Sequence, residues 1–241
     1  MTTYRLKVAY VGTNYCGWQI QPNSPTIQEE LQKVLKIITR EYVHVKGSGR
    51  TDAGVHSSGQ VAKFDSNEIR DLSTFQRSIN GLLPHDIAVR DLEICSDNFQ
   101  PRFDATSRYY IYTIYTRKPA FSAELGWYCA HDFDTEVFKK AAQLFLGIHD
   151  FEQFCIPRHD GKSTLCEIQE VEVKEFDGKI EFHLKGNRFL HRMVRAMVGC
   201  MMEIARGKIE ITLLEQVLDS GAQAPRVWAP PQGLNLWEVR Y

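Results

Sequence analysis

Segments with the period of a β-strand alternate with segments of helical period along the chain, and this alternation restricts the possible folds more than any other feature. Large apolar side chains occupy every second position of residues 4–10, as in a half-buried strand. Residues 27–38 instead carry one apolar stripe at helical spacing. Strand patterns at residues 60–64 and 87–94 enclose a shorter helical pattern. The first part of the chain is therefore predicted to run β-α-β-α-β.

The second part of the chain repeats this alternation. Residues 107–116 have the period of a strand, and residues 171–184 are predicted to form two strands joined at Asp177-Gly178. That dipeptide favours a tight type I′ hairpin turn, which joins antiparallel strands. A closing strand is expected at residues 234–239.

Capping residues mark the beginnings of several predicted helices. Thr26 and Glu29 have the spacing of a capping box, and Asp134 is a suitable N-cap for a later helix. A further helix is expected over residues 189–206, and a last one is expected to begin with a capping box at Thr212.

The length and composition allow one domain or two. With 241 residues and 43% apolar side chains, the chain can form one substantial core or two smaller cores. The repeated alternation favours two α/β halves, each a mostly antiparallel sheet with helices, in the α+β class. We place the boundary near Ala105, which predicts domains at residues 1–105 and 106–241.

The sequence shows none of the patterns of export, membrane insertion or disulfide stabilisation. No signal or transit pattern precedes the first strand, and no run approaches the roughly 18 apolar residues of a membrane span. The six cysteines form no Cys-x-x-Cys pair, which favours reduced thiols over a disulfide framework or a zinc site. We therefore expect a cytoplasmic protein without membrane contact or structural metal.

The formal net charge of −1 does not by itself indicate a nucleic acid partner. Residues 185–195, however, contain Lys185, Arg188, Arg192 and Arg195 and no acidic residue. Such a stretch can produce a local positive field on a nearly neutral protein, although a solvated helix face has the same pattern. Charge alone leaves both interpretations open.

A glycine-rich segment, residues 47–56, lies between two strand-like segments and contains Arg50 and Asp52. It lacks the Gly-Lys-Ser/Thr ending of a phosphate-binding loop, and no helical pattern follows it. The eight histidines show no His-Glu-x-x-His spacing, and no Gly-x-Ser-x-Gly elbow is present. From these residues alone, an Asp and an Arg that stabilise a turn are the simpler interpretation.

Four motifs together span nearly the whole chain. The longest is Gly49-Arg50-Thr51-Asp52-Ala53-Gly54-Val55-His56, followed by Gly59-Gln60-Val61-Ala62. The others are Tyr10, Gly12, Thr13, Tyr15, Gly17, Trp18 and Gln19; Arg102-Phe103 with Ala105-Thr106-Ser107-Arg108 and Tyr110; and Phe189, His191, Met193, Val194, Arg195 and Gly199, before a closing Pro230-Pro231 with Gly233-Leu234. The motifs, and their order along the chain, closely resemble those of the tRNA pseudouridine synthase A (TruA) family.

The resemblance implies two RNA-recognition-like (ferredoxin-like) α/β halves that form one extended, mostly antiparallel sheet, with helices on one face and a central basic cleft. It further implies a homodimer that binds tRNA across both subunits and isomerises uridine to pseudouridine at positions 38, 39 and 40 of the anticodon stem-loop. The reaction involves no net redox change and no net hydrolysis, so we expect no cofactor and no metal.

The resemblance also implies roles for individual residues. Asp52 is expected to be the nucleophile, and Tyr110 to stack on the uracil and to serve in proton transfer at its C5 atom. A nearby guanidinium would keep a carboxylate in a closed cleft ionised, so we expect Arg195 to pair with Asp52. Arg50 is expected to fill the space left by the turned-out base or to hold the adjoining phosphate. Salt-sensitive contacts to the RNA backbone are expected from Lys46, Arg102, Arg108, Arg188 and Arg192.

Two other functions stay open. A non-catalytic RNA-binding protein with the same α/β halves would use Tyr110 and Tyr112 only to stack on bases, although the intact segment around Asp52 argues against this. A small-molecule enzyme would use the same segment on a nucleotide, and the scattered basic residues do not exclude it. Release of the C5 hydrogen of uridine, measured in tRNA and in free nucleotide, distinguishes the three functions.

Overall fold

The chain folds into two compact units. The computed structural model describes residues 1–157 and 161–241. Unit 1 comprises Met1–Thr106 together with Asn235–Tyr241, and unit 2 comprises Ser107–Leu234. The predicted second domain, residues 106–241, differs from this division at its C-terminal end, because the last strand of the chain forms hydrogen bonds within unit 1.

The sheet of unit 1 has the strand order β4 (Ile87–Ile94), β1 (Thr2–Tyr10), β3 (His56–Ser66) and β10 (Leu234–Arg240). β1 is antiparallel to both of its neighbours, whereas β10 runs parallel to β3, with Asn235 opposite His56. The two-residue strand β2 (Lys46–Gly47) pairs with β3 in antiparallel orientation. Strands β1, β2 and β10, from different parts of the sequence, therefore all pair with β3.

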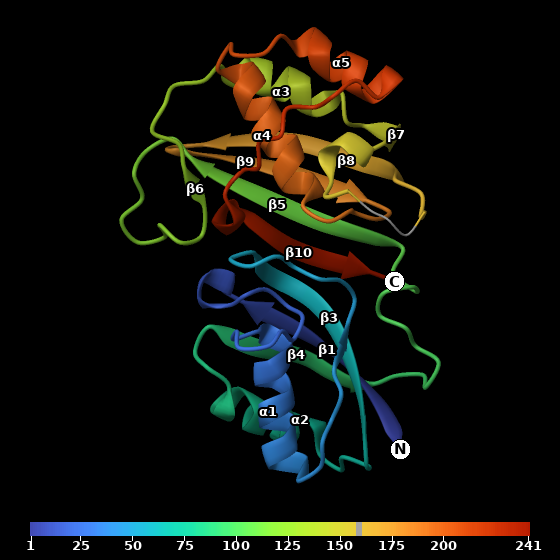
Figure 1. Cartoon of the computed structure of the whole chain (residues 1–241). Helices are drawn as coiled ribbons and strands as arrows, with labels where there is room; N and C mark the ends of the chain where they lie inside the picture. The colour runs from blue at the N-terminus through green and yellow to red at the C-terminus, as the bar shows by residue number, and fades with distance from the viewer. Residues whose placement is uncertain (158–160) are drawn as a thin grey trace. The chain divides into compact units, whose positions relative to one another are not determined.

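Two helices, α1 (Ile27–Thr39) and α2 (Leu72–Leu82), cover one face of this sheet and lie side by side in Figure 1. The alternating side chains of β1 from Tyr4 to Tyr10 form one buried cluster with apolar residues of both helices and of β4. The backbone N–H of Glu29 donates to the Thr26 hydroxyl at the start of α1, so the predicted N-cap is confirmed. The 3₁₀ turn η1 (Gly12–Asn14) follows β1 directly.

The sheet of unit 2 has the strand order β5 (Ser107–Tyr115), β9 (Lys179–Gly186), β8 (Leu165–Phe176) and β7 (Gly147–Asp150), all antiparallel. The short strand β6 (Trp127–Tyr128) is parallel to β5. β8 and β9 form the predicted hairpin, and Gly178 at its turn has a φ of +75°, a conformation that side-chain-bearing residues rarely adopt.

The helices of unit 2 are α3 (Thr135–Gln143), α4 (Met193–Ala205) and α5 (Ile211–Ser220), with 3₁₀ turns η2 (Glu152–Phe154) and η3 (Pro231–Gly233). α3 and α4 pack together against one face of the sheet (Figure 1). On that face the ring of Phe138 meets that of Phe182 edge-on at a centroid distance of 6.3 Å. The opposite face of β9 carries charged and polar side chains instead.

The predicted starts of two helices are wrong. The helix expected from residue 189 begins at Met193, because Arg192 has a φ of +64° and cannot continue a right-handed helix. The expected capping box at Thr212 is absent, since α5 begins at Ile211 with Glu210 as an N-cap that makes no side-chain hydrogen bond. The N-cap at Asp134 is confirmed, because its side chain accepts from the backbone N–H of Val137.

The predicted class, a mixed α/β protein of mostly antiparallel sheets with helices, is confirmed. One continuous sheet and a central basic cleft stay predictions. None of the helices that the structure describes is long and apolar enough to cross a lipid bilayer.

Candidate active site

The glycine-rich segment forms a connection between β2 and β3, here called the Asp52 loop (residues 48–55). Within it, the backbone N–H of Val55 donates to the carbonyl oxygen of Asp52 at 3.1 Å, which closes a turn. Asp52 is half-buried and Arg50 is exposed. The segment is thus the turn that the sequence predicted.

Strand β3 holds the first part of the Asp52 loop through one buried side chain. The Ser48 hydroxyl donates to Gln60 Oε1 at 2.6 Å, and Gln60 Nε2 donates to the carbonyl oxygen of Gly49 at 2.9 Å. The backbone N–H of Ser48 also donates to the carbonyl of Val61. Gln60 is fully buried, and its amide is the partner that Ser48 and Gly49 require. Gln60 belongs to a motif of the sequence, but the motif predicts no role for it. The signal that could have indicated one is a polar amide directly before the apolar residues Val61 and Ala62 of a strand.

The segment that follows β1 holds the loop on both sides of Asp52. Before it, the hydroxyls of Tyr10 and Thr51 form a buried hydrogen bond of 2.8 Å, and the backbone N–H of Trp18 donates to the carbonyl of Thr51. After it, the backbone N–H of Gly54 donates to the carbonyl of Tyr15. Asp52 is therefore flanked by residues whose backbones are fixed to unit 1.

Two glycines of this segment permit the loop to approach. A Cβ on Gly17 would lie 2.3 Å from the carbonyl oxygen of Thr51, and one on Gly12 would lie 2.1 Å from that of Val55. The backbone N–H of Gly12 donates to Nδ1 of the buried His56 at 3.0 Å. Because Nδ1 accepts this bond, a neutral His56 carries its proton on Nε2.

Three further residues with predicted roles belong to unit 1. Arg50 Nε donates to Gln19 Oε1 at 3.3 Å, while the side chain stays exposed. Lys46 is exposed on β2. Arg102 is exposed as well, with its guanidinium 5.7 Å from the ring centroid of Phe103. All three are accessible, as a contact to RNA phosphate requires.

Tyr110 and Arg195 belong to unit 2. Tyr110 is half-buried on β5, and its ring meets that of Phe189 edge-on at a centroid distance of 4.9 Å. Arg195 lies in the first turn of α4 and is half-buried. Its Nε donates to the carbonyl of Ala229 at 2.8 Å, and the backbone N–H of Ala229 donates back to the carbonyl of Arg195. The first bond holds the guanidinium beside Ala229, and the second joins the two backbones.

Tyr112, two residues after Tyr110 on the same face of β5, has a structural role. It is completely buried, and its hydroxyl donates to the carbonyl of Pro230 at 2.7 Å. Burial raises the pKa of Tyr112 well above its ordinary value, and the positive charge of Arg195 opposes this increase. Tyr112 is thus a permanent hydrogen-bond donor in the core, whereas Tyr110 is partly accessible.

The remaining basic residues with predicted RNA contacts also lie in unit 2. Arg108 is half-buried, and its Nη1 donates to the carbonyl of Asn187 at 2.8 Å. Arg188 is half-buried, and Arg192 is exposed with its guanidinium 5.8 Å from the ring centroid of Trp228.

Each unit thus carries a part of the predicted site. Unit 1 contains Lys46, Arg50, Asp52 and Arg102, and unit 2 contains Arg108, Tyr110, Arg188, Arg192 and Arg195. The predicted ion pair of Asp52 with Arg195 would join the two units and stays a prediction.

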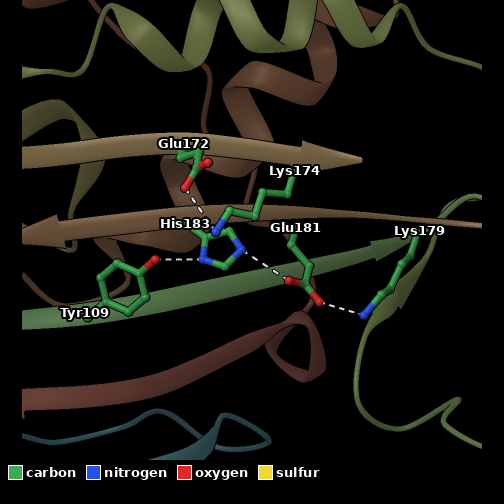
Figure 2. A network of polar contacts seen from close by, with 6 residues as sticks. All are labelled: Tyr109, Glu172, Lys174, Lys179, Glu181 and His183. Carbon is green, nitrogen blue, oxygen red and sulfur yellow. Dashed lines mark hydrogen bonds and ion pairs between the residues drawn. The ribbon is translucent and has the colours of Figure 1, made fainter. Parts of the chain in front are cut away.

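A separate polar network lies on the face of the unit 2 sheet that the helices leave uncovered (Figure 2). His183 contacts the Tyr109 hydroxyl through Nδ1 at 2.7 Å and Glu181 through Nε2 at 3.1 Å. Lys179 pairs with Glu181, and Lys174 pairs with Glu172 on the neighbouring strand.

The arrangement resembles an acid–base relay, but its protonation states make it structural. Burial lowers the pKa of His183 and raises that of Tyr109. Burial also tends to raise the pKa of Glu181, but its contacts with Lys179 and His183 outweigh this effect and lower it. A neutral His183 then donates from Nε2 to the Glu181 carboxylate and accepts the Tyr109 hydroxyl proton at Nδ1, so every polar group is satisfied without a reacting atom.

Among the residues that the structure describes, no three His, Cys, Asp or Glu side chains gather as metal ligands would. The absence of metal from the protein's chemistry stays a prediction.

Comparison with known proteins identifies the family. A family model described as tRNA pseudouridine synthase matches residues 7–104 and 141–241. The tRNA pseudouridine synthase A 1 of Protochlamydia amoebophila is 39% identical over 100% of this chain and 97% of its own length. The tRNA pseudouridine synthase A of Geotalea uraniireducens is 38% identical over the full length of both chains. The family-model match includes the Asp52 loop and Arg195 but leaves out residues 105–140 of this chain, which contain Tyr110, whereas both relatives match over the whole chain. These matches confirm the resemblance seen in the motifs: the chain belongs to the tRNA pseudouridine synthase A (TruA) family.

Proposed function

We propose that this protein isomerises uridine to pseudouridine in the anticodon stem-loop of tRNA, at positions 38, 39 and 40, with Asp52 as the nucleophile. Membership of the family and the names of relatives that match over the full chain support tRNA pseudouridine synthesis. The observation that carries the role of Asp52 is the loop around it, which is fixed on both sides by buried hydrogen bonds. A catalytic group requires such a rigid support.

The reaction rearranges bonds within one nucleotide. The bond from ribose C1′ to uracil N1 breaks, the base turns, and C1′ forms a bond to C5, whose hydrogen is lost while N1 gains one. Atoms and electrons balance without oxidant, reductant or net hydrolysis. The protein must therefore supply a nucleophile at the junction of sugar and base, hold the detached uracil, and remove the proton from C5.

Asp52 and Tyr110 meet two of these requirements. An ionised Asp52 provides the nucleophile, and Arg195 would keep this carboxylate charged in a cleft that excludes water. Tyr110 offers a partly accessible ring that can stack on the uracil and a phenol that can take part in the proton transfer at C5.

A uridine within a stem must leave its stack before it can reach Asp52, at a cost on the order of a few kcal/mol. Arg50, two residues before Asp52 and exposed, is suited to fill the vacated position or to hold the adjoining phosphate. The basic side chains Lys46, Arg102, Arg108, Arg188 and Arg192 would bind the RNA backbone and recognise its shape. A homodimer that binds one tRNA across both subunits completes this proposal.

The experiment is a tritium-release assay with uridine labelled at C5, offered in unmodified tRNA and as free nucleotide. We expect release from the tRNA only, and loss of release in Asp52→Asn. Asp219→Asn, which neutralises an exposed carboxylate on α5, is the matched control and should retain full activity.

Other outcomes identify the alternatives. A protein that binds tRNA and releases no tritium would be a non-catalytic RNA-binding protein, and release from the free nucleotide would indicate a small-molecule enzyme. Normal release by Asp52→Asn would remove Asp52 from the reaction. Arg195→Met should lower turnover more than RNA affinity; a collapse of affinity with normal turnover would make Arg195 a phosphate contact instead.

A further inference from the structure

Unit 2 contains a pocket that none of the proposed catalytic residues lines. Its volume is about 280 Å³, just below the range of roughly 300–1,000 Å³ for drug-sized ligand sites, which suits an occupant as small as a single nucleobase. Pro225, Arg226 and Trp228 line it from one segment of the chain, and Cys155 and Ile156 line it from another. Ala196, on the first half of α4, also lines the pocket.

Trp228 gives this pocket an aromatic surface that the core does not use. Its side chain is 39% exposed, whereas Trp18 in the core of unit 1 is 1% exposed. The guanidinium of Arg192 lies 5.8 Å from the centroid of the Trp228 ring, within the range of a cation–π contact. An exposed indole beside a guanidinium is a combination that proteins use to stack nucleobases.

The aromatic wall is rigid because α4 holds the segment that carries it. Ala229 exchanges two hydrogen bonds with Arg195, one from its backbone N–H and one to its carbonyl. The carbonyl oxygen of Val227 packs so closely on α4 that a Cβ on Gly199 would lie 2.3 Å from it. A stacking surface loses little conformational entropy on binding when it is fixed in this way.

The segment of Cys155 and Ile156 and the cation are both held at the start of α4. The backbone N–H of Ile156 donates to the carbonyl of His191, immediately before α4. Arg192, the N-cap of α4, has a φ of +64°, and this left-handed conformation is the one in which its side chain reaches Trp228. The pocket is thus assembled around the N-terminal half of α4.

The chemistry of the rim fits one nucleotide. Arg226 lines the pocket, is exposed and can bind a phosphate, while Glu152 and Gln153 offer acceptors and a donor to the edge of a base. A base within a stem is already stacked on its neighbours, so only an unpaired base can enter.

We propose that this pocket binds an unpaired nucleobase of the RNA substrate, stacked on Trp228 beside Arg192, with its phosphate on Arg226. The inference rests on the proposed function, since it takes the ligand to be a part of the same tRNA. It adds a stacking contact on unit 2 to the phosphate contacts proposed for the basic residues.

The test compares Trp228→Ala with Trp228→Phe in binding of unmodified tRNA transcript and in tritium release. Loss of one stacked base should weaken binding by about 5- to 150-fold in Trp228→Ala, with a larger effect on KM than on kcat. Trp228→Phe keeps a stacking ring and should retain most of the affinity. Phe121→Ala removes an exposed aromatic ring outside the pocket and should bind as the parent does.

Intrinsic fluorescence tests whether the base touches the indole. Addition of tRNA should quench the parent protein, and Trp228→Phe should lose this quenching while it still binds. Arg192→Gln should weaken binding and lower its salt dependence. If the parent releases tritium and Trp228→Ala binds tRNA as tightly as the parent, the inference fails while the proposed function stands. If the parent releases none, the proposed function itself fails.

Discussion

Gln60 should be the residue on which the position of the Asp52 loop most depends, and Gln60→Leu tests this. The substitution keeps the side chain similar in size but makes it apolar, so it removes the partners of the Ser48 hydroxyl and the Gly49 carbonyl. Ser48 is 2% exposed and Gln60 is completely buried, so water cannot replace the lost bonds without a movement of the loop. A buried polar group left unpaired costs about 1–3 kcal/mol.

Two such groups lose their partner, and the variant no longer buries an amide of its own, which offsets part of the cost. We therefore expect the free energy of unfolding to fall by about 2–4 kcal/mol. Urea denaturation measures this change, with an unchanged dependence on denaturant if the folded state stays compact. Gln216→Leu, at an exposed position of α5, is the matched control and should change stability by no more than about 0.5 kcal/mol.

A double-mutant cycle with Ser48→Ala separates the hydrogen bond from general disruption. In the parent, Ser48→Ala leaves Gln60 Oε1 without this donor and should cost about 1–3 kcal/mol. In the Gln60→Leu background the same change removes an unpaired hydroxyl and should cost little or stabilise. Turnover should fall with the displacement of Asp52. Equal costs of Ser48→Ala in both backgrounds, or an unchanged unfolding free energy in Gln60→Leu, would refute this reasoning.

Three further predictions concern packing, pH and chemistry. A Cβ on Gly199 would lie 2.3 Å from a backbone carbonyl oxygen, whereas one on Gly81 would meet nothing within 4 Å. Gly199→Ala should therefore lower the melting temperature and Gly81→Ala should raise it. Shifts of the same sign in both variants would contradict the packing of α4. Burial lowers the pKa of His183 below its ordinary value of 6.5, so the unfolded chain takes up a proton first and stability should fall as the pH drops below about 6.5. Urea denaturation between about pH 7.5 and 5.5 should show this loss of stability in the parent and in the control His44→Gln, whose histidine is exposed. In His183→Gln the free energy of unfolding should depend less on pH. The same pH dependence in all three proteins would contradict this prediction. Tyr110→Phe should bind tRNA normally and release little tritium, whereas full release would exclude its phenol from the proton transfer.

Local patterns were sufficient to predict most strands and helices, because each depends on the periodicity of its own residues. The strand at Ile87–Ile94 and the hairpin around Gly178 follow from alternation and from one turn dipeptide. The start of α4 could not be predicted in this way. Its apolar pattern continues backwards through Phe189, and only the left-handed backbone of Arg192 shows where the helix begins.

The candidate site was predictable to a different extent in each of its parts. The motif around Asp52 was recognised from its sequence, but nothing in the pattern showed that Gln60 holds the loop, because that contact depends on the pairing of β2 with β3. The pocket at Trp228 was not predicted either. Its walls come from residues 152–157, from α4 and from residues 225–228, and no local rule brings these three segments together.

The opening motif and the Asp52 loop are separate in the sequence but form one structural unit, which explains the residue types found in both. Gly12 and Gly17 stand where carbonyl oxygens of the loop approach too closely for any side chain. A substitution at either position must push the loop away from β1, and Asp52 with it. If Asp52 is the nucleophile, as proposed, residues of the opening motif that touch only the loop should act as positioning residues. Their replacement should lower turnover through displacement of Asp52, with little change in the salt dependence of RNA binding, because no phosphate contact is lost.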